Sequence, residues 1–284
     1  MAESVTSHDH SLFKRVVSAL VFGPVILWVF WTKGFVLYVF IVGITAFGQW
    51  ELYLMMREKL RFPHRLIGFV SGFLILTDVY LGHSEHLIGI IVVSLILYFL
   101  HEIFFGKEDI LQKVSLALFV IVYPALFVAF LIKIDLVHGV FWEPQKRFIL
   151  LFILITVWVF DTASYFSGRF FGKHRFFPHI SPRKTVEGFW GGFISIVLVG
   201  CIVSILNSNS LKFHFLVIAV LTALAGQIGD LSESIIKRGM GIKDSSHIIP
   251  GHGGILDRFD SLIFAGPVVY FYLAVCSLFY GGRF

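Results

Sequence analysis

Charged residues are scarce in this sequence. Only 14% of its residues are Asp, Glu, Lys or Arg, whereas 57% are hydrophobic, and the mean hydropathy is +0.86. This composition excludes an ordinary soluble domain and indicates a protein with many membrane spans. A strand barrel is excluded as well, because the apolar segments are continuous runs rather than short alternating stretches.

Cysteine is also rare, and several familiar motifs are missing. The two cysteines, Cys201 and Cys276, lie inside apolar runs, which excludes a disulfide framework and a thiolate metal site. We find no Walker A loop, no GxSxG elbow, no internal repeat and no close pair of histidines beside the acidic residues of the last two apolar runs. A zinc site is therefore not expected.

Nine apolar runs approach the length of about 20 residues that a membrane-spanning helix needs. They cover residues 15–32, 34–56, 65–82, 86–105, 114–134, 148–171, 188–206, 213–234 and 259–280. The fold class predicted is therefore all-α, a polytopic helical membrane protein with about nine transmembrane helices. With nine spans, 17 of the 23 Lys and Arg fall on the side of the N-terminus and 6 on the other. This asymmetry predicts a cytoplasmic N-terminus.

The first polar constellation is FDTASYFSGRFFGKH. Asp161 follows a long apolar run in a predicted helix, and an ionisable group at that depth marks either a functional site or a structural pair with a neighbouring helix. Ser164, Gly168 and Gly172 recur every four residues, a stripe that permits close helix packing.

The second constellation is ISPRKTVEGFWGG. Ser181 followed by Pro182 predicts a helix N-cap with proline at the first helical position. Arg183, Lys184 and Thr185 would then crowd the first turn, which makes sense if a phosphate is bound there. The alternative is a cluster of basic residues on the cytoplasmic side of a span.

The third constellation runs from ALAGQIGDLSESIIKRG to LDRFD. Helical spacing places Gln227, Asp230, Ser234 and Lys237 on one face. A segment rich in glycine and proline follows, and Asp257 and Asp260 then begin the last span. Asp230, Asp257 and Asp260 are oxygen ligands that suit Mg²⁺, which also favours substrate phosphates. Neighbouring basic residues would meet the remaining phosphate charge. These are Lys237, Arg238, Lys243 and Arg258.

The stretch SESIIKRGMGIKDSSHIIPGHGGILDRFD, residues 232–260, closely resembles the signature of the phosphatidate cytidylyltransferases, also called CDP-diacylglycerol synthases. The block FGKHRFFPHISPRKTVEGFWGG is similar to a second block of that family. The positions that match the signature are Ser234, Lys237, Arg238, Lys243, Asp244, His252, Gly253, Gly254, Asp257, Arg258 and Asp260. Ser164 departs from the alanine expected before Tyr165, which weakens only the assignment of Asp161.

The resemblance implies transfer of the cytidylyl group of CTP to phosphatidate, with Mg²⁺ required and K⁺ as a possible second cation. It implies catalytic roles for Asp230, Lys237, Lys243, Asp257 and Arg258, and metal binding by Asp230, Asp257 and Asp260. Substrate binding falls to Ser181, Arg183, Lys184, Thr185, Ser234, Arg238, Asp244, His252, Gly253 and Gly254. Asp161 is an additional candidate site residue to which no single role is assigned.

The organisation expected is a polar tail at 1–14, transmembrane helices over 15–147 and a catalytic transmembrane region over 148–284, with cytoplasmic loops at 172–187 and 235–258. We expect a homodimer in a bacterial inner membrane whose active site faces the cytoplasm, and no nucleic-acid partner.

Two alternatives remain open. A CTP-dependent polyprenol or phytol kinase would need a base for a neutral hydroxyl, and Asp244 or His252 would serve. A transporter would use Asp161 and Asp230 as an ion-coupling pair. The transporter ranks lower, because the polar groups gather toward one side and no repeat is visible.

Overall fold

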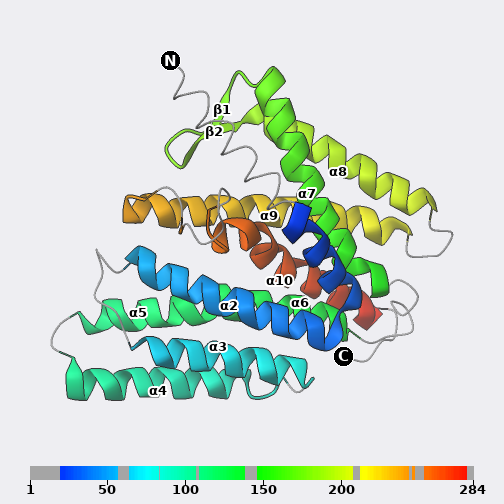
Figure 1. The fold of residues 1–284 in the computed structure, drawn as a ribbon. Coiled ribbons are helices and arrows are strands. Elements are labelled where there is room, and N and C mark those ends of the chain that lie inside the picture. Colours follow the sequence, from blue (N-terminus) through cyan, green and yellow to red (C-terminus); the bar gives the residue numbers. More distant parts are fainter. Residues whose placement is uncertain are drawn as a thin grey trace. The chain divides into compact units, whose positions relative to one another are not determined.

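The computed structural model describes residues 20–56, 64–82, 84–106, 109–137, 146–206, 212–242, 245–246 and 253–279 (Figure 1). The helices are Leu20–Thr32, α2 (Gly34–Met56), α3 (Arg65–Tyr80), α4 (Leu87–Phe105), α5 (Ile110–Ile121), η1 (Val122–Leu126), α6 (Phe127–Leu136), α7 (Lys146–Phe171), α8 (Val186–Leu206), α9 (Lys212–Met240) and α10 (Leu256–Phe279). Two strands, β1 (Arg175–Phe177) and β2 (Ser181–Thr185), form a small antiparallel hairpin.

Each of the nine predicted runs coincides largely with a helix, counting α5, η1 and α6 as the single segment Ile110–Leu136. Within the described ranges, seven helices are long and apolar enough to cross a membrane. The other two, Leu20–Thr32 and the 16-residue α3, are shorter. The prediction of an all-α polytopic membrane protein is confirmed.

The outward faces of these helices remain apolar. Ile103 of α4 is 69% exposed, and Ile205 of α8 is 81% exposed. Side chains of this kind are stable against lipid, and a helix satisfies its own backbone groups where no water is available. The helices therefore follow from the apolar runs without any amphipathic pattern.

The chain is divided into two compact units. Unit 1 comprises Met1–Ile132 and Gly239–Phe259, and unit 2 comprises Lys133–Arg238 and Asp260–Phe284. In unit 1, polar side chains join neighbouring helices. Ser71 Oγ of α3 lies 2.6 Å from Ser94 Oγ of α4, and Lys113 Nζ of α5 lies 2.6 Å from Glu102 Oε2 of α4. Such bonds fix helix neighbours in a medium that supplies no hydrophobic force between them.

A π-helical turn, η1, interrupts the run from α5 to α6 at Pro124. Proline has no N–H to donate to the carbonyl four residues earlier, which here belongs to Val120. Gln49 of α2 donates to that carbonyl at 3.3 Å and also to the carbonyl of Gly68 in α3 at 3.0 Å. A single buried amide thus repairs the proline defect and links three helices.

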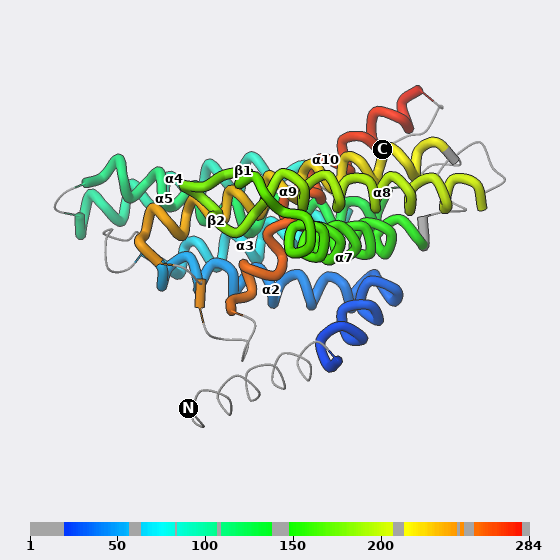
Figure 2. The backbone as a smooth tube through the Cα atoms, turned by 90° about the horizontal axis from the view of Figure 1, so that it is seen from above, coloured from blue at the N-terminus to red at the C-terminus, as the bar shows by residue number. Residues whose placement is uncertain are grey.

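In unit 2, the stripe of small residues packs α7 against α8 as predicted. A Cβ added at Gly188 of α8 would lie 2.8 Å from the carbonyl oxygen of Ser164 and 3.2 Å from Cα of Gly168. The two backbones therefore approach as closely as glycine allows. The hairpin of β1 and β2 connects these two helices (Figure 2).

Replacing Gln49 by leucine should lower the thermal unfolding midpoint in detergent, because two buried carbonyls each lose one hydrogen-bond donor. The expected cost is about 1–3 kcal/mol. Gln112 lies on α5 and is exposed, so Gln112→Leu is the matched control and should leave the midpoint unchanged. Equal midpoints for Gln49→Leu and Gln112→Leu would contradict the role of Gln49.

Candidate active site

The predicted helix start at Ser181 and Pro182 is wrong. Residues 181–185 form β2, and Phe177 pairs with Ser181 while Arg175 pairs with Thr185. A proline is tolerated here because both strands of a two-stranded hairpin are edges. The local Ser-Pro signal was overridden by pairing with a strand that lies outside the motif.

Thr185 caps α8 instead. Its Oγ1 accepts a hydrogen bond of 3.1 Å from the N–H of Gly188, the bond typical of an N-cap residue. Glu187 in the first turn accepts bonds from the backbone N–H groups of Lys173 and His174 and lies 2.6 Å from His174 Nδ1. The hairpin is therefore held at both ends, and Lys184 extends from a strand rather than from a helical turn.

The hairpin contacts α9 at two points. Lys184 Nζ lies 2.5 Å from Asp230 Oδ2, and both side chains are only partly exposed, at 22% and 34%. Arg238 donates from Nε to the carbonyl of Ile180 at 3.3 Å. The structure thus brings the second predicted constellation together with the third.

Close packing of α9 against α10 places a second acidic residue beside this contact. A Cβ added at Gly226 would lie 3.2 Å from Cβ of Ser261, and one added at Gly229 would overlap the carbonyl oxygen of Asp260. Any larger side chain at Gly229 would separate the helices. As a result, Asp260 is 8% exposed and faces α9.

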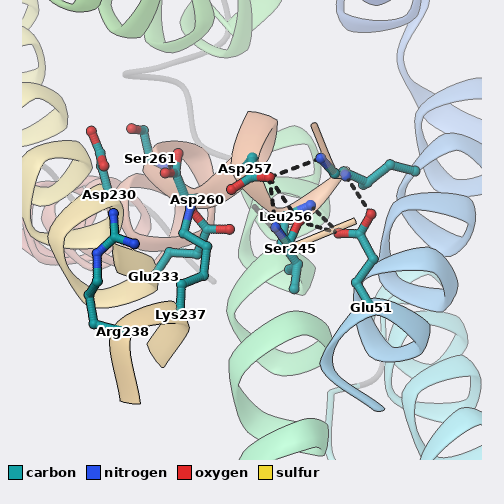
Figure 3. Close-up of polar contacts among 12 residues, drawn as sticks. Glu51, Asp230, Glu233, Lys237, Arg238, Ser245, Leu256, Asp257, Asp260 and Ser261 are labelled. Atoms are coloured by element: carbon teal, nitrogen blue, oxygen red, sulfur yellow. Dashed lines mark hydrogen bonds and ion pairs between the residues drawn. The ribbon is translucent and has the colours of Figure 1, made fainter. Parts of the chain in front are cut away.

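Asp260 lies in a field of like charge. Asp161, Asp230 and Glu233 all act on its carboxylate electrostatically. Lysines pair with two of these three acids, since Lys184 contacts Asp230 and Lys237 Nζ lies 2.8 Å from Glu233 Oε2. Figure 3 shows Asp230, Glu233 and Asp260 on neighbouring helical segments.

The structure adds Glu233 to the site residues, because it is buried beside Asp260 at 1% exposure. The sequence analysis did not predict it. Its spacing of four residues before Lys237 is the arrangement that favours an ion pair on a helix, and this signal was available in the sequence. Ser234, which was predicted, is also buried, at 8% exposure.

The chemistry of these side chains fits a hard divalent cation. Among the residues that the structure describes, no three His, Cys, Asp or Glu side chains form a group able to hold one ion. Mg²⁺ needs no such cage, because it is usually bound by one or two carboxylates together with waters and substrate phosphates. Asp260 and Asp230, two oxygen donors that repel each other, meet that requirement.

The last predicted acid, Asp257, accepts hydrogen bonds from Ser245 and Gly254, which precede α10 in unit 1. Its Oδ2 accepts bonds from the N–H of Gly254 at 2.9 Å and from the N–H and Oγ of Ser245 at 3.2 and 2.9 Å. Glu51 of α2 lies in the same polar network (Figure 3). Gly253 has φ +82°, a conformation that glycine adopts without strain, and Arg258 is exposed.

Three predicted site residues, Lys243, Asp244 and His252, lie outside the described residues.

The profile of the cytidylyltransferase family matches residues 13–276 of this chain. The chain belongs to this family.

Several cytidylyltransferases are similar to it over part of their length. The phosphatidate cytidylyltransferase of Staphylococcus saprophyticus is 48% identical over 121 residues, 42% of this chain and 46% of that protein. The enzyme of the same name from Haemophilus influenzae is 40% identical over 178 residues, 61% of this chain and 60% of that protein. That from Bacillus subtilis is 44% identical over 124 residues, 43% of this chain and 46% of that protein. The chain thus spans between 46% and 60% of the length of these relatives.

Adding one methyl group at Gly229 should disrupt this site. In Gly229→Ala, the new Cβ meets the backbone of Asp260, so α9 and α10 must separate and the thermal midpoint in detergent should fall. A clash that the backbone must relieve costs about 1–3 kcal/mol. In Gly89→Ala of α4 the Cβ meets nothing within 4 Å, and this control should be neutral or slightly more stable. A Gly229→Ala midpoint at or above that of Gly89→Ala would contradict the close approach.

Proposed function

We propose that this protein transfers the cytidylyl group of CTP to phosphatidate, giving CDP-diacylglycerol and pyrophosphate. The observation that carries the proposal is the buried Asp260, set among acids whose lysine partners, Lys184 and Lys237, reach them from the hairpin and from α9. Membership of the cytidylyltransferase family and relatives named phosphatidate cytidylyltransferase support the choice of substrates.

The reaction forms a bond between a phosphate oxygen of phosphatidate and the α-phosphorus of CTP. The bond from that phosphorus to the bridging oxygen breaks, and pyrophosphate leaves with its electrons. Because the attacking oxygen is already anionic, no strong general base is required. Positioning and charge neutralisation then supply most of the rate enhancement.

The cationic side chains of the site suit the phosphate groups of both substrates. Lys184 and Lys237 are held in place by Asp230 and Glu233, so their ammonium groups are already oriented before a phosphate arrives. Arg238 is fixed to the hairpin through the carbonyl of Ile180. An ordered set of cations costs less reorganisation in the transition state than a mobile one.

Asp230 and Asp260 would hold Mg²⁺, and Asp257 belongs to the same predicted set. The ion would supply further neutralisation of phosphate charge when bound. A second cation such as K⁺, a homodimer and a site facing the cytoplasm of a bacterial inner membrane remain predictions.

Labelled CTP tests the reaction directly. With phosphatidate and Mg²⁺, label from α-³²P CTP should enter the lipid and label from γ-³²P CTP should not. The reverse pattern, with a polyprenol or phytol as acceptor, would show a CTP-dependent kinase. Uptake of substrate into vesicles without CTP turnover would show a transporter.

Asp260→Asn should separate stability from activity. Burial and the like charges of Asp230, Glu233 and Asp161 disfavour the ionised form of Asp260, so a neutral Asn of the same shape should leave the thermal midpoint constant or raise it. Turnover should fall by about 10²-fold or more, because a charge that the reaction needs is lost. Any increase of the wild-type midpoint on adding Mg²⁺ should also disappear.

Asp78→Asn is the matched control. Asp78 is a buried acid of α3 in unit 1, bonded to His86 at 2.8 Å, and the substitution should leave turnover unchanged. Wild-type turnover and an unchanged response to Mg²⁺ in Asp260→Asn would remove Asp260 from the site.

A further inference from the structure

Glu51 of α2 is a fully buried carboxylate with four hydrogen-bond donors. Its Oε1 accepts from the N–H of Ile255 at 2.8 Å and from Oγ of Ser246 at 2.5 Å. Its Oε2 accepts from the N–H of Leu256 at 2.8 Å and from Oγ of Ser245 at 3.1 Å. The exposed fraction of Glu51 is 0%, and all five residues belong to unit 1.

Two of these donors belong to the beginning of α10. The first N–H groups of a helix have no partner within the helix, and they carry the positive end of its dipole. Ile255 stands immediately before α10 and its apolar side chain cannot accept a bond. Glu51, 205 residues before Leu256 in the chain, therefore supplies both the acceptors and the negative charge that a local capping residue would provide.

The other two donors lie at the far end of the loop that precedes α10. Ser245 and Ser246 follow α9, so one carboxylate binds both ends of the segment from 245 to 256. Gly254 is required for this arrangement. A Cβ added there would overlap Oγ of Ser245 and lie 2.6 Å from each oxygen of Glu51.

The position of Glu51 is itself fixed by its neighbours on α2. A Cβ added at Gly48 would lie 3.0 Å from the side chain of Leu256, so α2 and the start of α10 pack closely at this point. Gln49 ties α2 to Gly68 and Val120, and these bonds prevent α2 from sliding. A buried carboxylate on a fixed helix is a rigid anchor.

We propose that Glu51 is a positioning residue for cytidylyl transfer. By holding the start of α10 and the far end of the preceding loop, it sets the placement of Asp257 and Arg258, which the first turn of α10 carries. This inference rests on the proposed function for its catalytic part. The anchoring of the loop does not depend on that function.

Glu51→Gln is the sharpest variant, because it keeps the shape of the side chain. The N–H groups of Ile255 and Leu256 bond to different oxygens, so a glutamine must direct its NH₂ group at one of them. Hydrogen exchange in detergent should show the amides of Ile255 and Leu256 exchanging about 10-fold faster or more, as expected for a locally weakened helix end. In the labelled-CTP assay, kcat should fall by about 10²-fold, the effect of a small misplacement of reacting groups.

A purely structural role would not produce the same pattern. The KM for phosphatidate should stay within about threefold of wild type, because loss of positioning lowers kcat and leaves substrate binding nearly unchanged.

Glu102→Gln is the matched control. Glu102 is a buried acid of α4 in unit 1, paired with Lys113, and its neutralisation should lower the thermal midpoint without changing kcat or the exchange at Ile255 and Leu256.

Wild-type kcat in Glu51→Gln, or unchanged exchange at Ile255 and Leu256, overturns the proposal. If Glu51→Gln does not accumulate as folded protein, Ser246→Ala replaces it. That change removes one of the four donors to Glu51 and leaves the bonds from the N–H groups of Ile255 and Leu256. Because Glu51 is then held less firmly, these two amides should exchange faster than in wild type, and kcat should fall by less than in Glu51→Gln. Wild-type exchange and wild-type kcat in Ser246→Ala would again overturn the proposal.

The assay also distinguishes this proposal from the proposed function. Faster exchange in Glu51→Gln alone, in a protein that never transfers α-³²P label to phosphatidate, would show that Glu51 anchors the loop and that the function proposed for the chain is wrong. If wild type transfers the α-³²P label to phosphatidate and Glu51→Gln has the kcat and the amide exchange of wild type, the proposed function is right and the positioning role of Glu51 is wrong.

Discussion

The contact of α9 with α10 at Gly226 and Gly229 is the constraint on which the polar cluster depends. Without side chains at these two positions, the backbone of α10 lies against α9, and the carboxylate of Asp260 is taken out of contact with solvent. An acid buried in this way is costly unless a cation or a donor compensates it. Because of this helix contact, the ionised form of Asp260 is stable only if a positive charge lies close to it.

Lys237 and Lys184 supply positive charge to the acids near Asp260. Lys237 pairs with Glu233 one turn earlier on α9, and Lys184 reaches Asp230 from β2. These pairs neutralise the acids around Asp260 rather than Asp260 itself. A site that keeps acids and cations adjacent can bind both a metal ion and the phosphates of a nucleotide, which suits the chemistry of the cytidylyltransferase family.

In unit 1, two carboxylates bind the backbone just before α10 and at its first residue. Loops that surround catalytic groups tend to be the least stable parts of a protein. Here Glu51 and Asp257 together accept the N–H groups of Gly254, Ile255 and Leu256, so the approach to α10 is bonded continuously. The buried acid gains enough hydrogen bonds to offset its desolvation.

The nine apolar runs by themselves determined the helical membrane fold, because a chain in lipid must satisfy its backbone groups internally and only helices suit continuous apolar segments. The stripe of Ser164 and Gly168 also followed directly from the sequence, since helical geometry fixes such a relation locally. The start of α8 did not, because Ser181 pairs with Phe177 across a hairpin and Thr185 becomes the cap. Only the tertiary structure could assign Glu51, a single acid near the end of an apolar run whose donors lie 194 to 205 residues away. Its role, like that of Gly229, depends on which backbones come together, and neither residue carries that information in its own neighbourhood of the sequence.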